Sequence, residues 1–275
     1  MNNICFYMAP YPKVKSYFDL IDCSVEHGLD HLEGFCRFEL EEPDIEAAKK
    51  IKEYADKKGV RFSCFSVFIN LVGEDAPDMM VKLKGFADVC KILECPYLHH
   101  TIVNNFYDPD LVLNKKEENY KKGLLAVREI YDYAEKLGVK TIYEDQGYIF
   151  NGIDGFGKFL KEVDRAVGVV ADFGNIYQVG GTAEEFIDAF GHLALHAHIK
   201  NVSIKESNES GDGLRTTAGK YMFKDTLHDG CVDCKRMVEL LKAKGYKGDF
   251  GLEFGATEDD SDYMRESIAE IKSWF

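Results

Sequence analysis

The sequence predicts a single (β/α)8 barrel, an α/β fold, and three observations support this. Short β-branched or aromatic runs alternate with longer amphipathic stretches eight times along the chain. Strict alternation of this kind implies a parallel sheet, and eight such units close into a barrel. The length of 275 residues fits one barrel, which typically takes about 250 residues. A hydrophobic content of 45% provides a large core, so we expect residues 1–275 to form one domain.

The first half of the chain contains four strand–helix pairs, with glycine and proline at the expected helix ends. Gly28, Gly59 and Gly138 follow amphipathic stretches, where glycine commonly ends a helix because it accepts a positive φ. Pro43 begins another stretch, since the first helical turn does not need the N–H that proline lacks. The expected strands are Ile4–Met8, His31–Phe35, Val60–Phe68 and Tyr97–Val103, and the expected helices are Lys13–His27, Pro43–Lys58, Pro77–Leu93 and Lys115–Leu137.

The second half repeats the alternation, with one long connection. The expected strands are Val139–Glu144, Gly168–Asp172, Leu193–Lys200 and Asp249–Phe254, and the expected helices are Gly155–Val163, Thr182–Phe190, Cys231–Lys244 and Ser261–Trp274. Residues 201–229, after the seventh strand, form a long connection rich in Gly, Ser, Asn and Asp. Loops of this length are usually lids or binding loops, so we expect this one to cover the barrel mouth. A doubly wound open sheet is the alternative fold, but its glycine fingerprint after the first strand is missing.

Charge and cysteine usage narrow the class of protein. The net charge of −14 argues against a general nucleic-acid binder and against binding to anionic membranes, because no cationic field offsets phosphate repulsion. No stretch reaches the roughly 18 to 20 apolar residues of a membrane span, and residues 1–12 do not resemble a signal peptide. The eight cysteines are spread along the chain, which is typical of reduced thiols in the cytoplasm. We therefore expect a cytoplasmic protein.

Four consecutive expected strands end in residues that can bind a metal ion: Glu144, Asp172, His198 and Glu253. Active sites of these barrels lie at the carboxyl ends of the strands, so the four side chains should meet there. One such acid alone is more often a helix cap, but burying three carboxylates together without a cation would be very costly. A mostly oxygen site of this kind suits Mn²⁺ or Mg²⁺, with Co²⁺, Fe²⁺ or Zn²⁺ as alternatives. The sequence therefore predicts one divalent metal ion.

Nearly the whole chain resembles the xylose-isomerase-like TIM barrel superfamily, in particular its sugar (phosphate) isomerases and epimerases of the tagatose-3-epimerase type. The motifs that carry the resemblance are Tyr143-Glu144-Asp145, Asp172-Phe173-Gly174-Asn175, His198-Ile199-Lys200-Asn201, and Gly245-Tyr246-Lys247-Gly248 before Leu252-Glu253. The resemblance implies that Glu144, Asp172, His198 and Glu253 hold a single divalent metal ion. It also implies that Glu144 and Glu253 are the catalytic acid–base pair.

The chain departs from the family pattern at two positions. Asn175 stands where the pattern Asp-x-x-His often has histidine, and Asn201 stands where His-x-Lys-Asp often has aspartate. Asparagine is a poor metal ligand but can hydrogen-bond a sugar hydroxyl. Both departures concern the substrate, and neither touches the four ligands.

Five residues are candidates for substrate binding: Asn175, Lys200, His100, Glu33 and Arg215. The pair His99-His100 ends the fourth strand, and alternation places one imidazole inside the barrel mouth, either as a substrate contact or as a support for another residue. We assign this position to His100. Glu33 ends the second strand and could anchor a supporting network or orient a hydroxyl. Lys200 could neutralise a phosphate or an enediolate oxygen, and Arg215 lies in the long connection.

The predicted function is a metal-dependent isomerase of carbohydrate metabolism, either a ketose epimerase or an aldose–ketose isomerase. Its substrate would be a small sugar, with or without phosphate, or a polyol ketone. The reaction would begin with proton abstraction next to a carbonyl and pass through an enediolate. Three alternatives remain: an inosose-type dehydratase on the same scaffold, an apurinic-site endonuclease, and a non-catalytic sugar-binding barrel. The sequence leaves open whether the protein forms a homo-oligomer.

Overall fold

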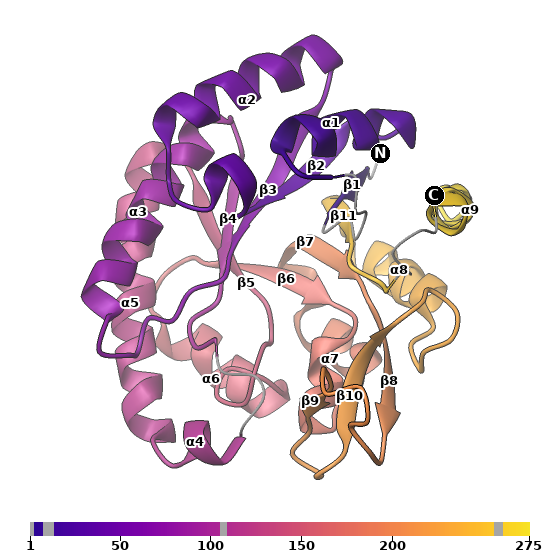
Figure 1. Cartoon of the computed structure of the whole chain (residues 1–275). Helices are drawn as coiled ribbons and strands as arrows, with labels where there is room; N and C mark the ends of the chain where they lie inside the picture. Colours follow the sequence, from indigo (N-terminus) through magenta and orange to yellow (C-terminus); the bar gives the residue numbers. More distant parts are fainter. Residues whose placement is uncertain (1–2, 8–13, 105–108, 256–260) are drawn as a thin grey trace.

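A computed structural model describes residues 3–7, 14–104, 109–255 and 261–275, and its centre is a closed barrel of parallel strands (Figure 1). The order around the barrel is β1-β11-β7-β6-β5-β4-β3-β2. The strands are β1 (Ile4–Phe6), β2 (His31–Phe35), β3 (Arg61–Val67), β4 (Tyr97–His100), β5 (Lys140–Tyr143), β6 (Gly168–Asp172), β7 (Ala194–Ile199) and β11 (Asp249–Leu252). The barrel prediction is confirmed, and the open-sheet alternative is wrong because β1 pairs with both β2 and β11.

Helices surround the barrel (Figure 1). They are α1 (Tyr17–Glu26), α2 (Ile45–Lys58), α3 (Ala76–Ile92), α4 (Pro109–Leu113), α5 (Lys116–Leu137), α6 (Ile153–Glu162), α7 (Ala183–Phe190), α8 (Cys234–Ala243) and α9 (Ser261–Lys272), with short 3-10 turns at Phe38–Leu40, Asn175–Val179 and Gly191–Leu193. The sequence did not predict α4. The expected ends at Met8 and Lys13 lie outside the described residues.

Capping side chains explain where two helices begin. Helix α1 begins at Tyr17 because the Ser16 hydroxyl accepts a hydrogen bond from the Asp19 N–H. Helix α8 begins at Cys234, three residues later than predicted, because the Asp233 carboxylate accepts from the Arg236 N–H. Such caps satisfy N–H groups that the first helical turn leaves unpaired. The sequence located the helices but not these ends.

Inward-facing side chains of the strands fill the interior of the barrel in layers. The lower layer includes Cys64, Ile142 and Val170, which are fully buried. Successive side chains of a strand alternate between its two faces, so residues two positions further along each strand point into the same interior. Those residues are polar: Ser66, Glu144 and Asp172. Cys64, Ile142 and Val170 therefore lie beneath a polar layer at the carboxyl ends of the strands, and the buried Glu33 and His196 are in register with Cys64 and Val170.

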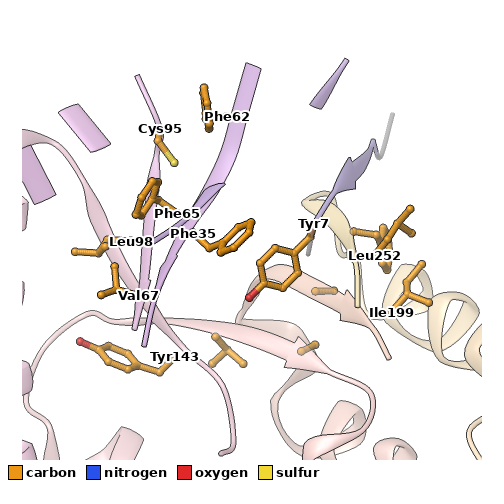
Figure 2. Packing of buried hydrophobic residues seen from close by; sticks show 14 of the residues in the cluster. Tyr7, Phe35, Phe62, Phe65, Val67, Cys95, Leu98, Tyr143, Ile199 and Leu252 are labelled. Carbon is orange, nitrogen blue, oxygen red and sulfur yellow. The ribbon is translucent and has the colours of Figure 1, made fainter. Parts of the chain in front are cut away.

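The outer faces of the same strands pack under the helices. Figure 2 shows part of this core, including Phe65 and Leu98 from β3 and β4, both fully buried. Tyr143 also belongs to it and lies 5.3 Å from the Phe159 ring of α6. Burial of these large side chains supplies the main stabilisation of the barrel. Both faces of each strand are thus removed from water.

The connection after β7 differs from the irregular lid that we expected. It forms a three-stranded antiparallel sheet of β8 (Asn201–Lys205), β9 (Leu214–Arg215) and β10 (Tyr221–Asp225), in the order β8-β10-β9. The side chains of Val202 and Met222 are buried. They anchor this sheet in the core, which explains why the segment forms regular structure. The segment follows β7 directly, at the carboxyl ends of the strands, and Lys224 of β10 reaches Glu253.

Asn201 joins the two ends of this connection. Its side-chain oxygen accepts hydrogen bonds from the Val202 and Val232 N–H groups, and its amide donates to the Leu227 carbonyl. The side chain is fully buried. Asparagine can both donate and accept, whereas an ionised aspartate could only accept. The departure from the family pattern at this position therefore serves the local structure.

Within the described ranges, none of the helices is long and apolar enough to span a membrane.

Candidate metal and active site at the carboxyl ends of the strands

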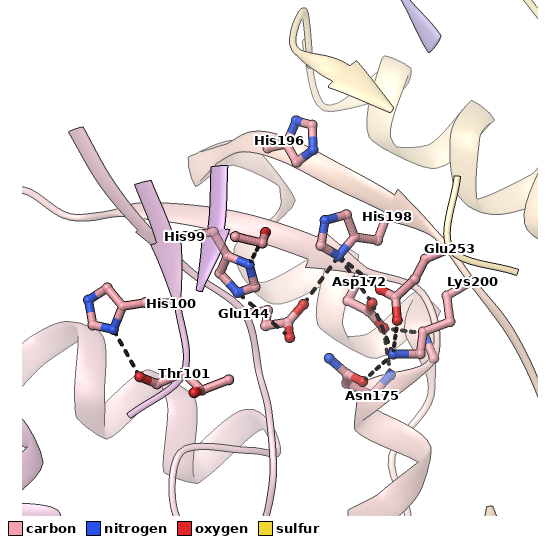
Figure 3. A network of polar contacts seen from close by, with 12 residues as sticks. His99, His100, Thr101, Glu144, Asp172, Asn175, His196, His198, Lys200 and Glu253 are labelled. Carbon is pink, nitrogen blue, oxygen red and sulfur yellow. Dashed lines mark hydrogen bonds and ion pairs between the residues drawn. The ribbon is translucent and has the colours of Figure 1, made fainter. Parts of the chain in front are cut away.

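Four side chains converge at one point in the polar layer of the barrel (Figure 3). Glu144 directly follows β5, Asp172 ends β6, His198 lies in β7, and Glu253 directly follows β11. Each offers one ligand atom, and these atoms all lie within 4.8 Å of one another. The predicted convergence of the four residues is therefore present in the structure. We refer to Glu144, Asp172, His198 and Glu253 as the quartet.

His198 lies at the centre of the quartet. Its Nδ1 atom is 3.3 Å from Glu144 Oε2, 3.5 Å from Asp172 Oδ2 and 3.2 Å from Glu253 Oε2. Ligands about 2.0 to 2.3 Å from one ion lie roughly 3 Å apart in adjacent coordination positions. The four atoms therefore have spacings that suit a single small divalent cation.

Unpaired atoms also gather at this point. Among the described residues, Glu144 Oε2, Asp172 Oδ2 and His198 Nδ1 are buried and have no hydrogen-bond partner. Such orphaned atoms are rare in native proteins and require an explanation. These three are the same atoms that face one another across the quartet. A cation would satisfy all of them at once, so the donor set fits a metal ion.

Glu33 fixes the orientation of His198 from below. Its carboxylate is fully buried in β2 and accepts from His198 Nε2 at 3.1 Å, His196 Nε2 at 2.7 Å and the Ser66 hydroxyl at 2.6 Å. Because Nε2 donates to a carboxylate, the neutral ring of His198 must present the lone pair of Nδ1 to the quartet. A carboxylate behind a histidine ligand is the usual arrangement at metal sites, where it sets ring orientation and basicity.

Two lysines approach the quartet from the side of Glu253. Lys200 Nζ lies 2.9 Å from Glu253 Oε1 and 3.6 Å from Asp172 Oδ2, and Lys224 Nζ lies 3.2 Å from Glu253 Oε1. Lys200 also donates to Asn175 Oδ1 at 2.9 Å. Asn175 and Lys200, each predicted to bind substrate, are therefore adjacent to the quartet, and Lys200 balances part of its negative charge.

Electrostatics distinguish Glu253 from Asp172 within the quartet. Burial opposes ionisation of Glu253, but Lys200 and Lys224 hold its pKa well below the usual value. Burial raises the pKa of Asp172, and the neighbouring Glu253 and Glu144 add to this while Lys200 opposes it. Burial lowers the pKa of His198, but Glu33 and the three quartet carboxylates outweigh this and raise it. The cluster therefore attracts positive charge, either as protons or as a cation.

Three predicted substrate contacts need correction. Glu33 is fully buried beneath His198 with both oxygens hydrogen-bonded, so it cannot contact a substrate. His100 points to the outer face of β4, where its ring bonds the Tyr143 hydroxyl at 2.8 Å and the Thr101 carbonyl at 2.9 Å. Arg215 pairs with Asp110 at 3.3 Å at the surface. Of the three, Glu33 contacts the quartet only through His198 Nε2 on its buried side, and the side chains of His100 and Arg215 bond other residues.

The side chain inside the mouth is His99. Its Nε2 atom lies 3.7 Å from Glu144 Oε1, and its ring centroid lies 5.8 Å from that of His198 (Figure 3). One imidazole of the pair faces the mouth, as alternation predicted, but it is that of His99 and not that of His100. Sequence analysis also missed Tyr7, whose buried ring stacks on His198 with centroids 5.1 Å apart. Tyr7 directly follows β1, and this place at a strand end could have identified it as a site residue.

Comparisons with known proteins agree with this fold. A family model described as xylose isomerase-like TIM barrel matches residues 21–274. Comparison with curated protein sequences gives no significant match. A xylose isomerase-like TIM barrel protein from Mycobacterium smegmatis, solved in complex with magnesium, is similar in structure, with a TM-score of 0.75 and 17% identity over 100% of this chain and 96% of that chain.

Two further similar structures are enzymes. One is a D-psicose 3-epimerase from Clostridium cellulolyticum, solved with D-tagatose, with a TM-score of 0.74 and 15% identity over 99% of this chain and 98% of that chain. The other is a probable 3-DHS dehydratase from Bacillus anthracis, with a TM-score of 0.75 and 14% identity over 99% of both chains. At these identities the likeness shows a shared fold.

Proposed function

Because the chain belongs to the xylose isomerase-like TIM barrel family, we propose that it is a divalent-metal-dependent isomerase or epimerase of a small ketose or polyol ketone. The observation that carries this proposal is the convergence of the quartet, with its unpaired atoms facing one another. An epimerase and a magnesium complex among the similar structures are consistent with it. Glu144, Asp172, His198 and Glu253 would hold the ion, and Mn²⁺ or Mg²⁺ suits three carboxylates and one imidazole.

The positions of the two glutamates suit proton transfer on opposite sides of a substrate. Glu144 follows β5 and Glu253 follows β11, and β6 and β7 lie between these strands in the barrel wall. A substrate lying over Asp172 and His198 would therefore have one carboxylate on each side. A bound divalent ion would supply Lewis-acid polarisation of a carbonyl and its neighbouring hydroxyl.

One ionised glutamate would then take the proton from the carbon next to the carbonyl, and the other, which must first take up a proton, would return it. Return to the opposite face of the same carbon gives epimerisation, and return to the neighbouring carbon gives isomerisation. Lys200 lies against Glu253 and Asn175, where its charge can stabilise negative charge on the enediolate oxygens. A dehydratase would begin with the same abstraction and then expel a hydroxyl group, and a dehydratase is among the similar structures.

The test is a screen of ketoses in deuterated water, with Mn²⁺ or with a chelator, followed by NMR. The proposal predicts deuterium incorporation next to the carbonyl that requires Mn²⁺ and stops on chelation. Products distinguish the reactions, since an epimer, an aldose and an unsaturated ketone have different spectra. Exchange that is unaffected by the chelator would contradict the metal-dependent mechanism. A protein that binds Mn²⁺ but neither binds nor exchanges any ketose would contradict the substrate class.

A further inference from the structure

The imidazole of His99 is held in one tautomer. The Ser66 hydroxyl donates to Glu33 Oε1 at 2.6 Å, and the Ser66 Oγ atom also lies 2.9 Å from His99 Nδ1. A hydroxyl has one proton to donate, and the carboxylate of Glu33 takes it. Ser66 can therefore only accept from His99, so the neutral ring carries its proton on Nδ1. The Nε2 atom is left with a lone pair and no proton.

This lone pair points into the mouth and has no partner. His99 Nε2 is buried, and nothing in the described part of the chain hydrogen-bonds to it. The atom facing it is Glu144 Oε1, at 3.7 Å. Both are acceptors when Glu144 is ionised, so they do not bond each other. A hydroxyl group beside this pair of atoms could donate a hydrogen bond to one of them, because 3.7 Å is too short for a third atom to lie between them.

The hydrogen-bond donor expected beside His99 is distinct from the metal ion that we propose for the quartet. Glu144 turns its other oxygen, Oε2, toward His198 Nδ1 at 3.3 Å, so the two oxygens face different neighbours. His99 is not among the four residues whose ligand atoms lie within 4.8 Å of one another. It therefore lies beside the quartet, next to Glu144 and His198.

We propose that His99 is a specificity-determining residue whose Nε2 accepts a hydrogen bond from one hydroxyl group of the substrate, next to Glu144. This inference rests on the proposed function, since it assigns a contact of the same polyhydroxylated substrate. Ser66 acts as a positioning residue, because it determines which nitrogen of His99 carries the proton. A site built to accept from a hydroxyl discriminates against an analogue that lacks it, because a buried acceptor is then left unpaired.

The experiment measures binding of ketoses to the Mn²⁺-loaded protein by calorimetry, using D-tagatose, D-psicose and D-fructose. Each ketose that binds is then compared with its monodeoxy analogues. Four proteins are tested: wild type, His99→Leu, His99→Gln and Ser66→Ala. Leucine has no acceptor, whereas glutamine can place a carbonyl oxygen near the position of Nε2. Thermal unfolding and a Mn²⁺ titration of each variant check folding and the quartet.

We expect removal of one particular hydroxyl to weaken binding to wild type about tenfold, the effect of one hydrogen bond. His99→Leu should bind that deoxy analogue and the parent ketose equally well, and His99→Gln should recover most of the difference. Ser66→Ala should show an intermediate preference, because the ring can then adopt either tautomer. Mn²⁺ affinity should stay close to that of wild type in the two His99 variants, because His99 lies outside the ligand set.

Several outcomes would overturn the inference. Equal discrimination among deoxy analogues by wild type and by a folded His99→Leu protein would show that no hydroxyl contacts His99. A large fall in Mn²⁺ affinity in His99→Leu would make His99 a metal ligand. In both cases the proposed function would stand. Mn²⁺ binding without binding of any ketose would overturn the proposed function and this inference together.

Discussion

Buried carboxylates in the two halves of the barrel wall differ in their hydrogen-bond partners. In the half formed by β1 to β4, Glu33 accepts hydrogen bonds from Ser66, His196 and His198. In the half formed by β5, β6, β7 and β11, Glu144 Oε2 and Asp172 Oδ2 are buried without a hydrogen-bond partner among the described residues. A carboxylate with occupied lone pairs supports its neighbours, whereas carboxylates with unpaired oxygens facing one another form a binding site.

The largest loss of turnover should follow a substitution in the half of the barrel formed by β5, β6, β7 and β11. Glu253→Gln should keep the fold and part of the metal affinity, because the amide oxygen can still coordinate. It should reduce turnover by about a hundred- to ten-thousand-fold, the usual contribution of general acid–base catalysis. The measurement is deuterium exchange next to the carbonyl of a ketose that the wild type turns over. Undiminished exchange in the variant would show that Glu253 is at most a ligand.

On the supporting side, Glu33→Gln should weaken Mn²⁺ binding about ten- to a hundredfold, as for other residues that orient a ligand. The amide cannot accept from Ser66, His196 and His198 together, so His198 would lose its fixed orientation. Calorimetric titration with Mn²⁺ measures the effect. Asp249→Asn is the matched control, because that carboxylate accepts from the Ser63 hydroxyl at the start of β11. Equal effects in both variants would contradict the role of Glu33.

Gly251 of β11 lies where Glu33 of one half meets His198 of the other, and its missing side chain leaves room for both. A Cβ atom at this position would lie 2.6 Å from Glu33 Oε2 and 3.1 Å from His198 Cδ2. Gly251→Ala should therefore cost about 1 to 3 kcal/mol of unfolding free energy, as for other overpacked sites. In Gly157→Ala, the control in helix α6, the Cβ would lie 3.4 Å from Phe190, and we expect a gain of up to about 1 kcal/mol. Denaturant unfolding compares the two variants.

His100 differs from His99 in having both ring nitrogens bonded within the protein, and this affects acid stability. Burial lowers the pKa of His100 to about 4, from 6.5. Since the unfolded chain takes up this proton first, the stability present above pH 6.5 is lost as the pH falls toward 4. At pH 5 the loss amounts to about 2 kcal/mol. His100→Gln should show a shallower fall of unfolding free energy between pH 7 and 5, while the exposed His192→Gln should match wild type.

The fold and the quartet were predictable because their signals are local. An acid or histidine at the end of each of four strands points to one place once the barrel is assigned. The phase of β4 was not predictable in this way, because the helices cover the outer face of the strand and leave both faces buried. Leu98 and His100 share the outer face, whereas Tyr97 and His99 share the inner one.

Two other features depend on information that one sequence does not carry. The bond between Glu33 and His196 joins residues 163 positions apart, so only the closed barrel brings them together. The sheet formed by β8, β9 and β10 is rich in polar residues, and its composition therefore resembles that of a loop. Its few buried residues, such as Val202 and Met222, become informative only when their contacts are known.

The central claim is that the quartet binds one divalent cation rather than forming a self-contained ion-pair cluster with Lys200. A crystal grown with Mn²⁺ and measured at the manganese absorption edge tests this directly. The account predicts one anomalous peak per chain at this position, about 2.0 to 2.3 Å from Glu144, Asp172, His198 and Glu253. Well-ordered side chains at the quartet without a peak, with Lys200 still bonded to Glu253 at millimolar Mn²⁺, would contradict it.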